Sequence, residues 1–122
     1  MNIIDGKHFH LTETEKYEIW KKKFRKEMTN FLGEIFAHLN IGCYVSIQKV
    51  DKWNIEFNVS SGMATLGWLD KRLQADPTLM NILNGKGPIE LVGDKSKKCF
   101  NIKANTREEL DAQLGYLKIA LN

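Results

Sequence analysis

Apolar residues recur every three or four positions from Thr12 to Leu39, which is the spacing of one face of an α-helix. The stripe consists of Tyr17, Trp20, Phe24, Met28, Phe31, Ile35 and Leu39. Thr12 and Glu15 have capping-box spacing at its start, and Asn40-Ile41-Gly42 supplies a stop. A helix over 12–39 would span about 42 Å, more than the roughly 35 Å width of a compact chain of this size. We therefore expect this helix to be the structural centre and its first turns to project.

The two halves of this predicted helix differ in character. The first half carries a dense basic run, namely Lys21, Lys22, Lys23, Arg25 and Lys26. The second half has only Glu34 and His38 as ionisable residues, which favours burial on more than one side. Gly33 costs about 1 kcal/mol in a helix interior and therefore predicts a close packing contact there.

Composition indicates a single domain of 122 residues with enough apolar content, 43%, to form a core without disulfides or a metal. We expect a cytoplasmic protein, because the chain has no apolar signal region and no apolar run long enough to span a membrane. Cys43 and Cys99 lack CxxC spacing and are expected to be free thiols. The net charge of +3 permits nucleic-acid contact without requiring it.

The remainder of the chain reads as two ββα units, at 43–75 and 88–121, after an N-terminal arm or short strand at 1–11. Strands are predicted at 43–50, 53–59, 89–92 and 98–104, with turns at 51–52 and 93–97. Ser60 or Ser61 would cap the second helix and Asn105 or Thr106 the last, with a short helical turn after Asp76-Pro77. The predicted class is α+β, αββαββα, with a four-stranded, mainly antiparallel sheet and helices on one face.

The two units resemble each other in sequence. Asp51-Lys52 and Phe57-Asn58-Val59 recur 43 positions later, and Leu66-Gly67-Trp68-Leu69 recurs 48 positions later as Leu114-Gly115-Tyr116-Leu117. These matches have two interpretations, an internal duplication or chance similarity between short segments.

A search for catalytic and metal-binding motifs is negative. The chain has no HExxH, GxGxxG, GxxxxGK[ST] or GxSxG pattern, and its glycine-rich 84–88 segment follows a helix, unlike a phosphate loop. His8 and His10 have no recognisable ligand partner. We therefore expect no catalytic residue, no metal and no cofactor. A small enzyme whose site is assembled in space from the histidines and cysteines is the third hypothesis.

Aromatic placement favours binding to another protein. Trp68 lies off the leucine stripe of its helix, and Tyr116 and Ile119 lie off the stripe of the last helix. Either the long helix covers these residues, or they contact a partner or a second copy of the chain. Tyr44 is expected on the outward sheet face and is the fourth candidate partner-binding residue. The first hypothesis is a non-enzymatic regulator or inhibitor that docks on another protein, with homodimerisation as an additional expectation.

Nucleic-acid binding is the alternative. The basic run at 21–26 would act together with a lysine cluster predicted at a hairpin tip, namely Lys95, Lys97 and Lys98, with Lys86 near it. The sequence leaves open whether these groups converge. The outward sheet face is expected to carry one aromatic residue, which argues against RNA recognition by base stacking.

Overall fold

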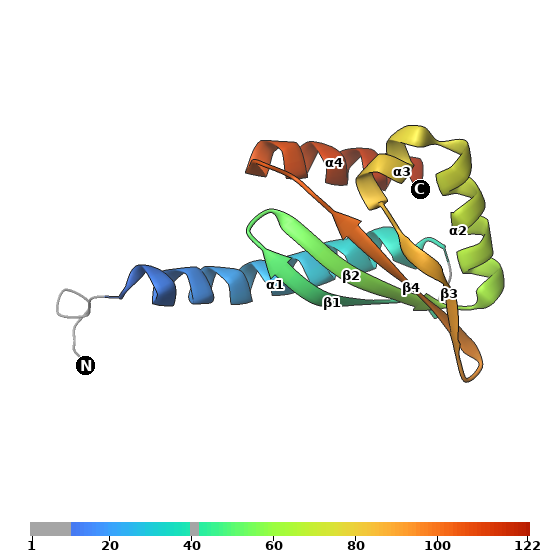
Figure 1. Cartoon of the computed structure of the whole chain (residues 1–122), viewed down its shortest axis with the longest axis horizontal. Helices are drawn as coiled ribbons and strands as arrows, with labels where there is room; N and C mark the ends of the chain where they lie inside the picture. Colours follow the sequence, from blue (N-terminus) through green and yellow to red (C-terminus); the bar gives the residue numbers. More distant parts are fainter. Residues whose placement is uncertain (1–10, 40–41) are drawn as a thin grey trace.

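The computed structural model describes residues 11–39 and 42–122 and confirms the predicted α+β fold (Figure 1). The elements are α1 (Glu13–Ala37), β1 (Tyr44–Asp51), β2 (Asn54–Ser61), α2 (Met63–Ala75), α3 (Pro77–Leu83), β3 (Lys86–Val92), β4 (Lys95–Ile102) and α4 (Arg107–Ala120). The short helical turn predicted after Asp76-Pro77 is α3. The predicted arm at 1–10, with His8 and His10, and the stop at Asn40-Ile41 lie outside the described residues.

Helix α1 begins with the predicted capping box. The Thr12 hydroxyl accepts a hydrogen bond from the Glu15 amide at 3.1 Å, and the Glu15 carboxylate accepts one from the Thr12 amide at 3.0 Å. This backbone hydrogen bond from Thr12 lowers the pKa of Glu15. As predicted, the first turns of α1 extend past the sheet (Figure 1). Farther along α1, Trp20 packs edge-on against Trp53 of the β1–β2 turn, with ring centroids 5.3 Å apart.

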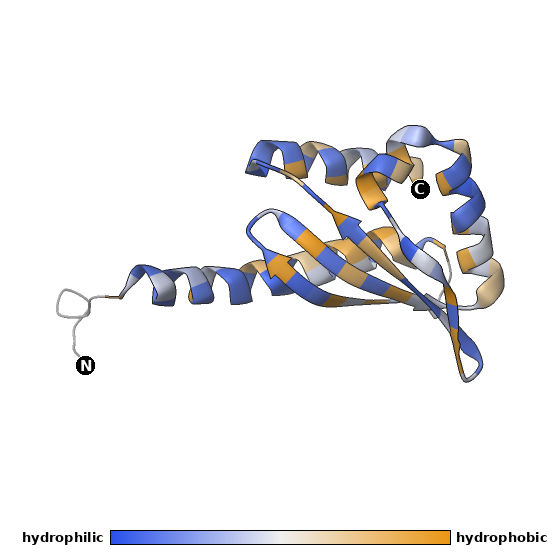
Figure 2. Cartoon of the chain, viewed as in Figure 1, coloured by the Kyte–Doolittle hydropathy of each residue, from blue (hydrophilic) through white to orange (hydrophobic). Residues whose placement is uncertain are grey.

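The four strands form one antiparallel sheet in the order β1-β2-β4-β3. Side chains along β2 and β4 alternate between buried and partly exposed, and the hydropathy colouring alternates in the same way (Figure 2). The buried side chains face the helices. Phe36 of α1 lies 5.8 Å from Phe57 of β2 and 6.0 Å from Phe100 of β4, measured between ring centroids. These three rings lie at the centre of the hydrophobic core.

The sheet has the arrangement expected of duplicated hairpins. The hairpins β1–β2 and β3–β4 meet through their second strands, and Phe57 pairs directly with Phe100 across that contact. These two phenylalanines are also matched by the 43-residue repeat. A twofold rotation near this pair would exchange the hairpins. Helices α1 and α3 have no counterpart under that rotation.

Three local predictions are wrong. Helix α2 is capped by Gly62 without a side-chain hydrogen bond, because strand alternation continues through Ser61, whose carbonyl accepts from the Ser96 hydroxyl. The polar turn predicted at 93–97 is shorter, because Gly93 adopts a φ of 62° and Val92 already pairs with Lys95. Gly33 makes no close packing contact, since a Cβ built on it would have no atom within 4 Å.

The other caps follow the predictions. The Asp76 carboxylate accepts from the Leu79 amide at 3.1 Å at the start of α3, and Pro77 occupies the first turn. The Thr106 hydroxyl accepts from the Glu109 amide at 3.1 Å at the start of α4. Among the described residues, no helix is both long enough and apolar enough to cross a membrane.

We predict that Ile35→Ala lowers the free energy of unfolding by about 2–5 kcal/mol, the range for large-to-small changes in a core. Ile35 is 3% exposed and belongs to the hydrophobic core. Ile19 on the same helix is 57% exposed, so Ile19→Ala should change the value by no more than about 0.5 kcal/mol. Urea denaturation of the two variants measures the difference. Equal losses would mean that α1 is not anchored through this stripe.

Candidate protein-docking surface

Polar contacts hold α2, α3 and α4 together at one end of the molecule, where the chain ends (Figure 1). The Arg72 guanidinium of α2 donates a hydrogen bond to the Ala120 carbonyl of α4 at 2.7 Å. The Tyr116 hydroxyl of α4 donates to the Asp76 carboxylate at the start of α3, also at 2.7 Å. That bond lowers the pKa of Asp76 and raises the pKa of Tyr116. The outer faces of α2 and α4 are therefore held in a fixed relation.

Large apolar side chains remain exposed on these outer faces. Trp68 is 46% exposed, and Ile119 is 78% exposed, although both lie in the middle or last turns of well-packed helices. Tyr116 is 37% exposed. The interpretation that the long helix covers these residues is therefore wrong. Leu39, just after the end of α1, lines a hollow beside Trp68 but does not cover the indole ring.

A trough continues from Trp68 along the second half of α1. One hollow of about 370 Å³ is lined by Phe31, Glu34, Ile35, Ala37, His38 and Lys118. A second of about 280 Å³ is lined by His38, Leu39, Trp68, Leu121 and Asn122. Both are lined in part by His38, and we call the two hollows together the helix trough. Its floor is largely apolar and its rim carries charge, as the Lys118 ammonium lies 6.0 Å from the Phe31 ring centroid.

Three glycines lie in the interiors of the surrounding helices, and no close contact with the described residues requires a glycine at these positions. Gly33, Gly67 and Gly115 belong to α1, α2 and α4, and a Cβ built on any of them would meet nothing within 4 Å. Gly67 precedes Trp68, and Gly115 precedes Tyr116. Glycine lowers helix stability, yet here it makes no room for a neighbouring residue of the chain. Because glycine has no side chain, another molecule can approach the helix backbone closely at these positions.

Tyr44 does not belong to this surface. It pairs with Ser60, whose side chain points away from the helices, so Tyr44 lies on the bare face of the sheet. It is 62% exposed there, with the Lys95 ammonium 4.7 Å from its ring centroid. We therefore define the docking surface as the helix trough together with Trp68, Tyr116 and Ile119.

The basic residues of α1 fall into two groups. The Arg25 guanidinium donates to the Ile47 carbonyl of β1, and Lys21 lies over the Tyr17 ring at 5.9 Å. The other group, Lys22, Lys23 and Lys26, is exposed and forms no ion pair with any residue that the structure describes.

The lysines predicted at the hairpin tip do not form one cluster. Lys95 and Lys97 are on the bare face, but Lys98 points the opposite way and pairs with the Asp70 carboxylate of α2. Only 10% of its side chain is exposed. In addition, the basic part of α1 lies beside the β1–β2 turn, whereas the β3–β4 tip lies at the opposite end of the sheet (Figure 1). The two predicted basic groups therefore do not converge.

The described residues hold no cluster of metal-ligating type. Within 11–39 and 42–122, no three His, Cys, Asp or Glu side chains are placed to hold a metal ion. Burial raises the pKa of both Cys43 and Cys99, which makes their thiols weaker nucleophiles at neutral pH. His38 lines both hollows of the helix trough, and neither cysteine does.

Comparison of the chain with protein-family models, with curated proteins and with solved structures finds no match. A functional assignment therefore depends on the surfaces described above.

We predict that Gly67→Ala and Gly115→Ala each raise the free energy of unfolding by about 0.5–1 kcal/mol, because the added methyl group improves helix propensity and meets no atom. Gly85→Ala is the control. Its Cβ would lie 2.9 Å from Lys98 and 3.3 Å from the Phe100 ring, so that variant should lose stability. Urea denaturation measures all three. A loss at Gly67 or Gly115 would contradict the open environment of these glycines.

Proposed function

We propose that the protein is a non-enzymatic binding protein, a regulator or inhibitor that acts by docking on another protein. The observation that carries this proposal is the exposed Trp68 at the end of the helix trough. Tryptophan is among the residues that contribute most to protein–protein affinity, especially when it lies beside a pocket that becomes dry on binding. The open glycine positions on α2 and α4 support the same proposal.

The composition of the docking surface favours a reversible partner over an obligate dimer. Interfaces of obligate dimers are strongly apolar, whereas non-obligate interfaces are about as polar as the rest of a protein surface. Here Trp68 is stacked with Arg72, whose guanidinium carbon lies 5.9 Å from the indole centroid. Ile119 likewise follows the exposed Lys118. The free protein can therefore keep this surface in water.

The shape of the trough favours a helical segment of the partner. An amphipathic helix binds a groove between helices by placing its apolar stripe on the floor and its polar flanks at the rim. The trough runs beside α1, with Phe31 and Ile35 in its floor and Glu34 and Lys118 at its rim. Both rim charges are available to orient the incoming helix.

We predict that Trp68→Ala weakens binding of the partner by about 30-fold or more, the effect of removing a hot-spot residue worth at least ~2 kcal/mol. The partner is first captured from the source cell on immobilised protein, and its affinity is then measured by calorimetry with purified components. Tyr44→Ala is the matched control, because it removes an exposed aromatic residue from the opposite face.

Two outcomes would contradict the proposal. Equal binding by Trp68→Ala and the unmodified protein would exclude the docking surface. Sedimentation velocity that shows a dimer at micromolar concentration, lost in Trp68→Ala and kept in Tyr44→Ala, would assign the surface to self-association.

Nucleic-acid binding is the second candidate, favoured by the exposed Lys22, Lys23 and Lys26 on the first half of α1. Three phosphate contacts predict a salt slope of about −2.7, and thus a loss on the order of 40-fold in affinity between 50 and 200 mM salt. A filter-binding titration measures this slope. Lys22→Glu with Lys26→Glu should abolish retention, while Lys95→Glu with Lys97→Glu should not. No retention of DNA or RNA at low salt would exclude this candidate.

A further inference from the structure

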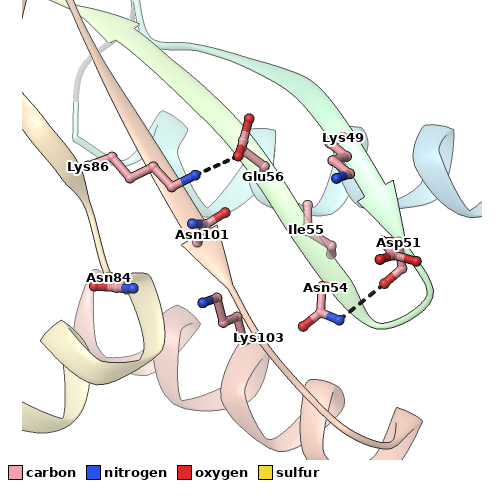
Figure 3. A pocket seen from close by; sticks show the side chains of 9 residues that line it. All are labelled: Lys49, Asp51, Asn54, Ile55, Glu56, Asn84, Lys86, Asn101 and Lys103. Carbon is pink, nitrogen blue, oxygen red and sulfur yellow. Dashed lines mark hydrogen bonds and ion pairs between the residues drawn. The ribbon is translucent and has the colours of Figure 1, made fainter.

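The face of the sheet opposite the helices carries polar side chains in cross-strand rows. Because directly paired residues share a face, the pairing of the strands defines these rows. One row contains Ser46, Asn58, Cys99 and Lys86, and the next contains Lys49, Glu56 and Asn101. No helix of the described residues covers this face, which is seen from the front in Figure 3, with the helices behind the sheet.

A recess of about 420 Å³ lies on this bare face (Figure 3). Its walls come from the ends of β1 and β2, from β4 and from the segment that joins α3 to β3. The nine residues that line it are Lys49, Asp51, Asn54, Ile55, Glu56, Asn84, Lys86, Asn101 and Lys103. We call it the sheet recess. Its volume is within the range of about 300–1,000 Å³ that small-molecule sites occupy.

The charges around the sheet recess leave two lysines and one carboxylate, that of Asp51, without an ion pair among the described residues. The Lys86 ammonium forms an ion pair with the Glu56 carboxylate at 2.8 Å, which lowers the pKa of Glu56 and raises the pKa of Lys86. Both groups are therefore charged at neutral pH. Lys49 and Lys103 form no ion pair with any residue of the described chain. Three lysines against two carboxylates give the recess a net charge of +1.

Amide groups supply the remaining polar lining. The Asn54 side chain is held at both ends, because its amide nitrogen donates to the Asp51 carbonyl at 3.3 Å and its oxygen accepts from the Ala104 amide at 3.2 Å. Asn101 and Asn84 form no side-chain hydrogen bond within the described chain, so both amides are available to a ligand. The recess thus combines a fixed frame with free donors and acceptors.

We propose that the sheet recess binds a small polar anion, a compound with a phosphate or carboxylate group and further hydrogen-bonding groups such as hydroxyls. Lys49 and Lys103 bind the anionic group, and Asn84 and Asn101 bind the hydroxyls. The lining excludes two other ligand classes. Its single apolar residue is Ile55, too little for an apolar ligand, and none of the nine is aromatic, so a nucleobase has no ring to stack on.

The test uses three probes: inorganic pyrophosphate, glucose 6-phosphate and citrate. Calorimetry of the full chain at low salt is expected to give a dissociation constant below about 1 mM for at least one of them, an affinity that two charge-assisted contacts can supply. A preference for the phosphate probes or for citrate identifies the anionic group. The double variant Lys49→Gln with Lys103→Gln should weaken that binding by about tenfold or more.

A matched control separates the recess from general surface charge. Lys16→Gln with Lys71→Gln makes the same change in net charge, from +3 to +1, on exposed helix positions outside the basic group of α1. That variant should bind the probe as tightly as the unmodified protein does. Equal weakening in the two double variants, or no binding of any probe at 10 mM, would overturn the proposal. Because Trp68 lies on the other side of the molecule, Trp68→Ala leaves probe binding unchanged and the two proposals fail independently.

Discussion

The contact of Phe36 with Phe57 and Phe100 is the constraint on which the rest of the structure depends. Each ring comes from a different element: α1, β2 and β4. The two phenylalanines of the sheet face each other at the point where the hairpins join, and each hairpin alone would leave its ring in water. The packing of Phe36 of α1 on Phe57 and Phe100 therefore joins the two hairpins into one sheet. It also decides which face of that sheet receives all of the helices.

This one-sided core leaves two surfaces with opposite chemistry. On the helix side, α1 lies nearest β1, while α2 and α3 contact β4, and the trough forms where α1, α2 and α4 come together. Its floor is apolar, because the second half of α1 has apolar residues on more of its circumference than the sheet can cover. On the other side, the period-2 alternation that buries Phe57 and Phe100 exposes their polar neighbours. The bare face is therefore polar for the same reason that the core is apolar.

The elements that the sequence predicted well are those with a strong local signal. The caps at Thr12, Asp76 and Thr106 are side chain to backbone hydrogen bonds within four residues, and alternation identifies β2 and β4. Lys98 was predicted to lie with Lys95 and Lys97 in a basic cluster at a hairpin tip, although it shares the parity of Phe100 and therefore points inward. The sequence indicates only part of the proposed docking surface, because Trp68 and Ile119 are visible from helix periodicity, whereas the trough depends on packing between three helices. The sheet recess had no signal, since its residues come from four separate segments.

Gly85 connects the core to the wall of the sheet recess. It lies so close to Phe100 and Lys98 that a Cβ at this position would be 2.9 Å from the lysine side chain and 3.3 Å from the ring. The Lys98 side chain cannot move aside freely, because its ammonium is held by Asp70 in a largely buried pair. The flanking residues Asn84 and Lys86, which line the recess, are therefore positioned by the same contact that closes the core. Because this wall is already fixed, binding of a ligand would lose little conformational entropy there, and preorganisation of this kind increases affinity.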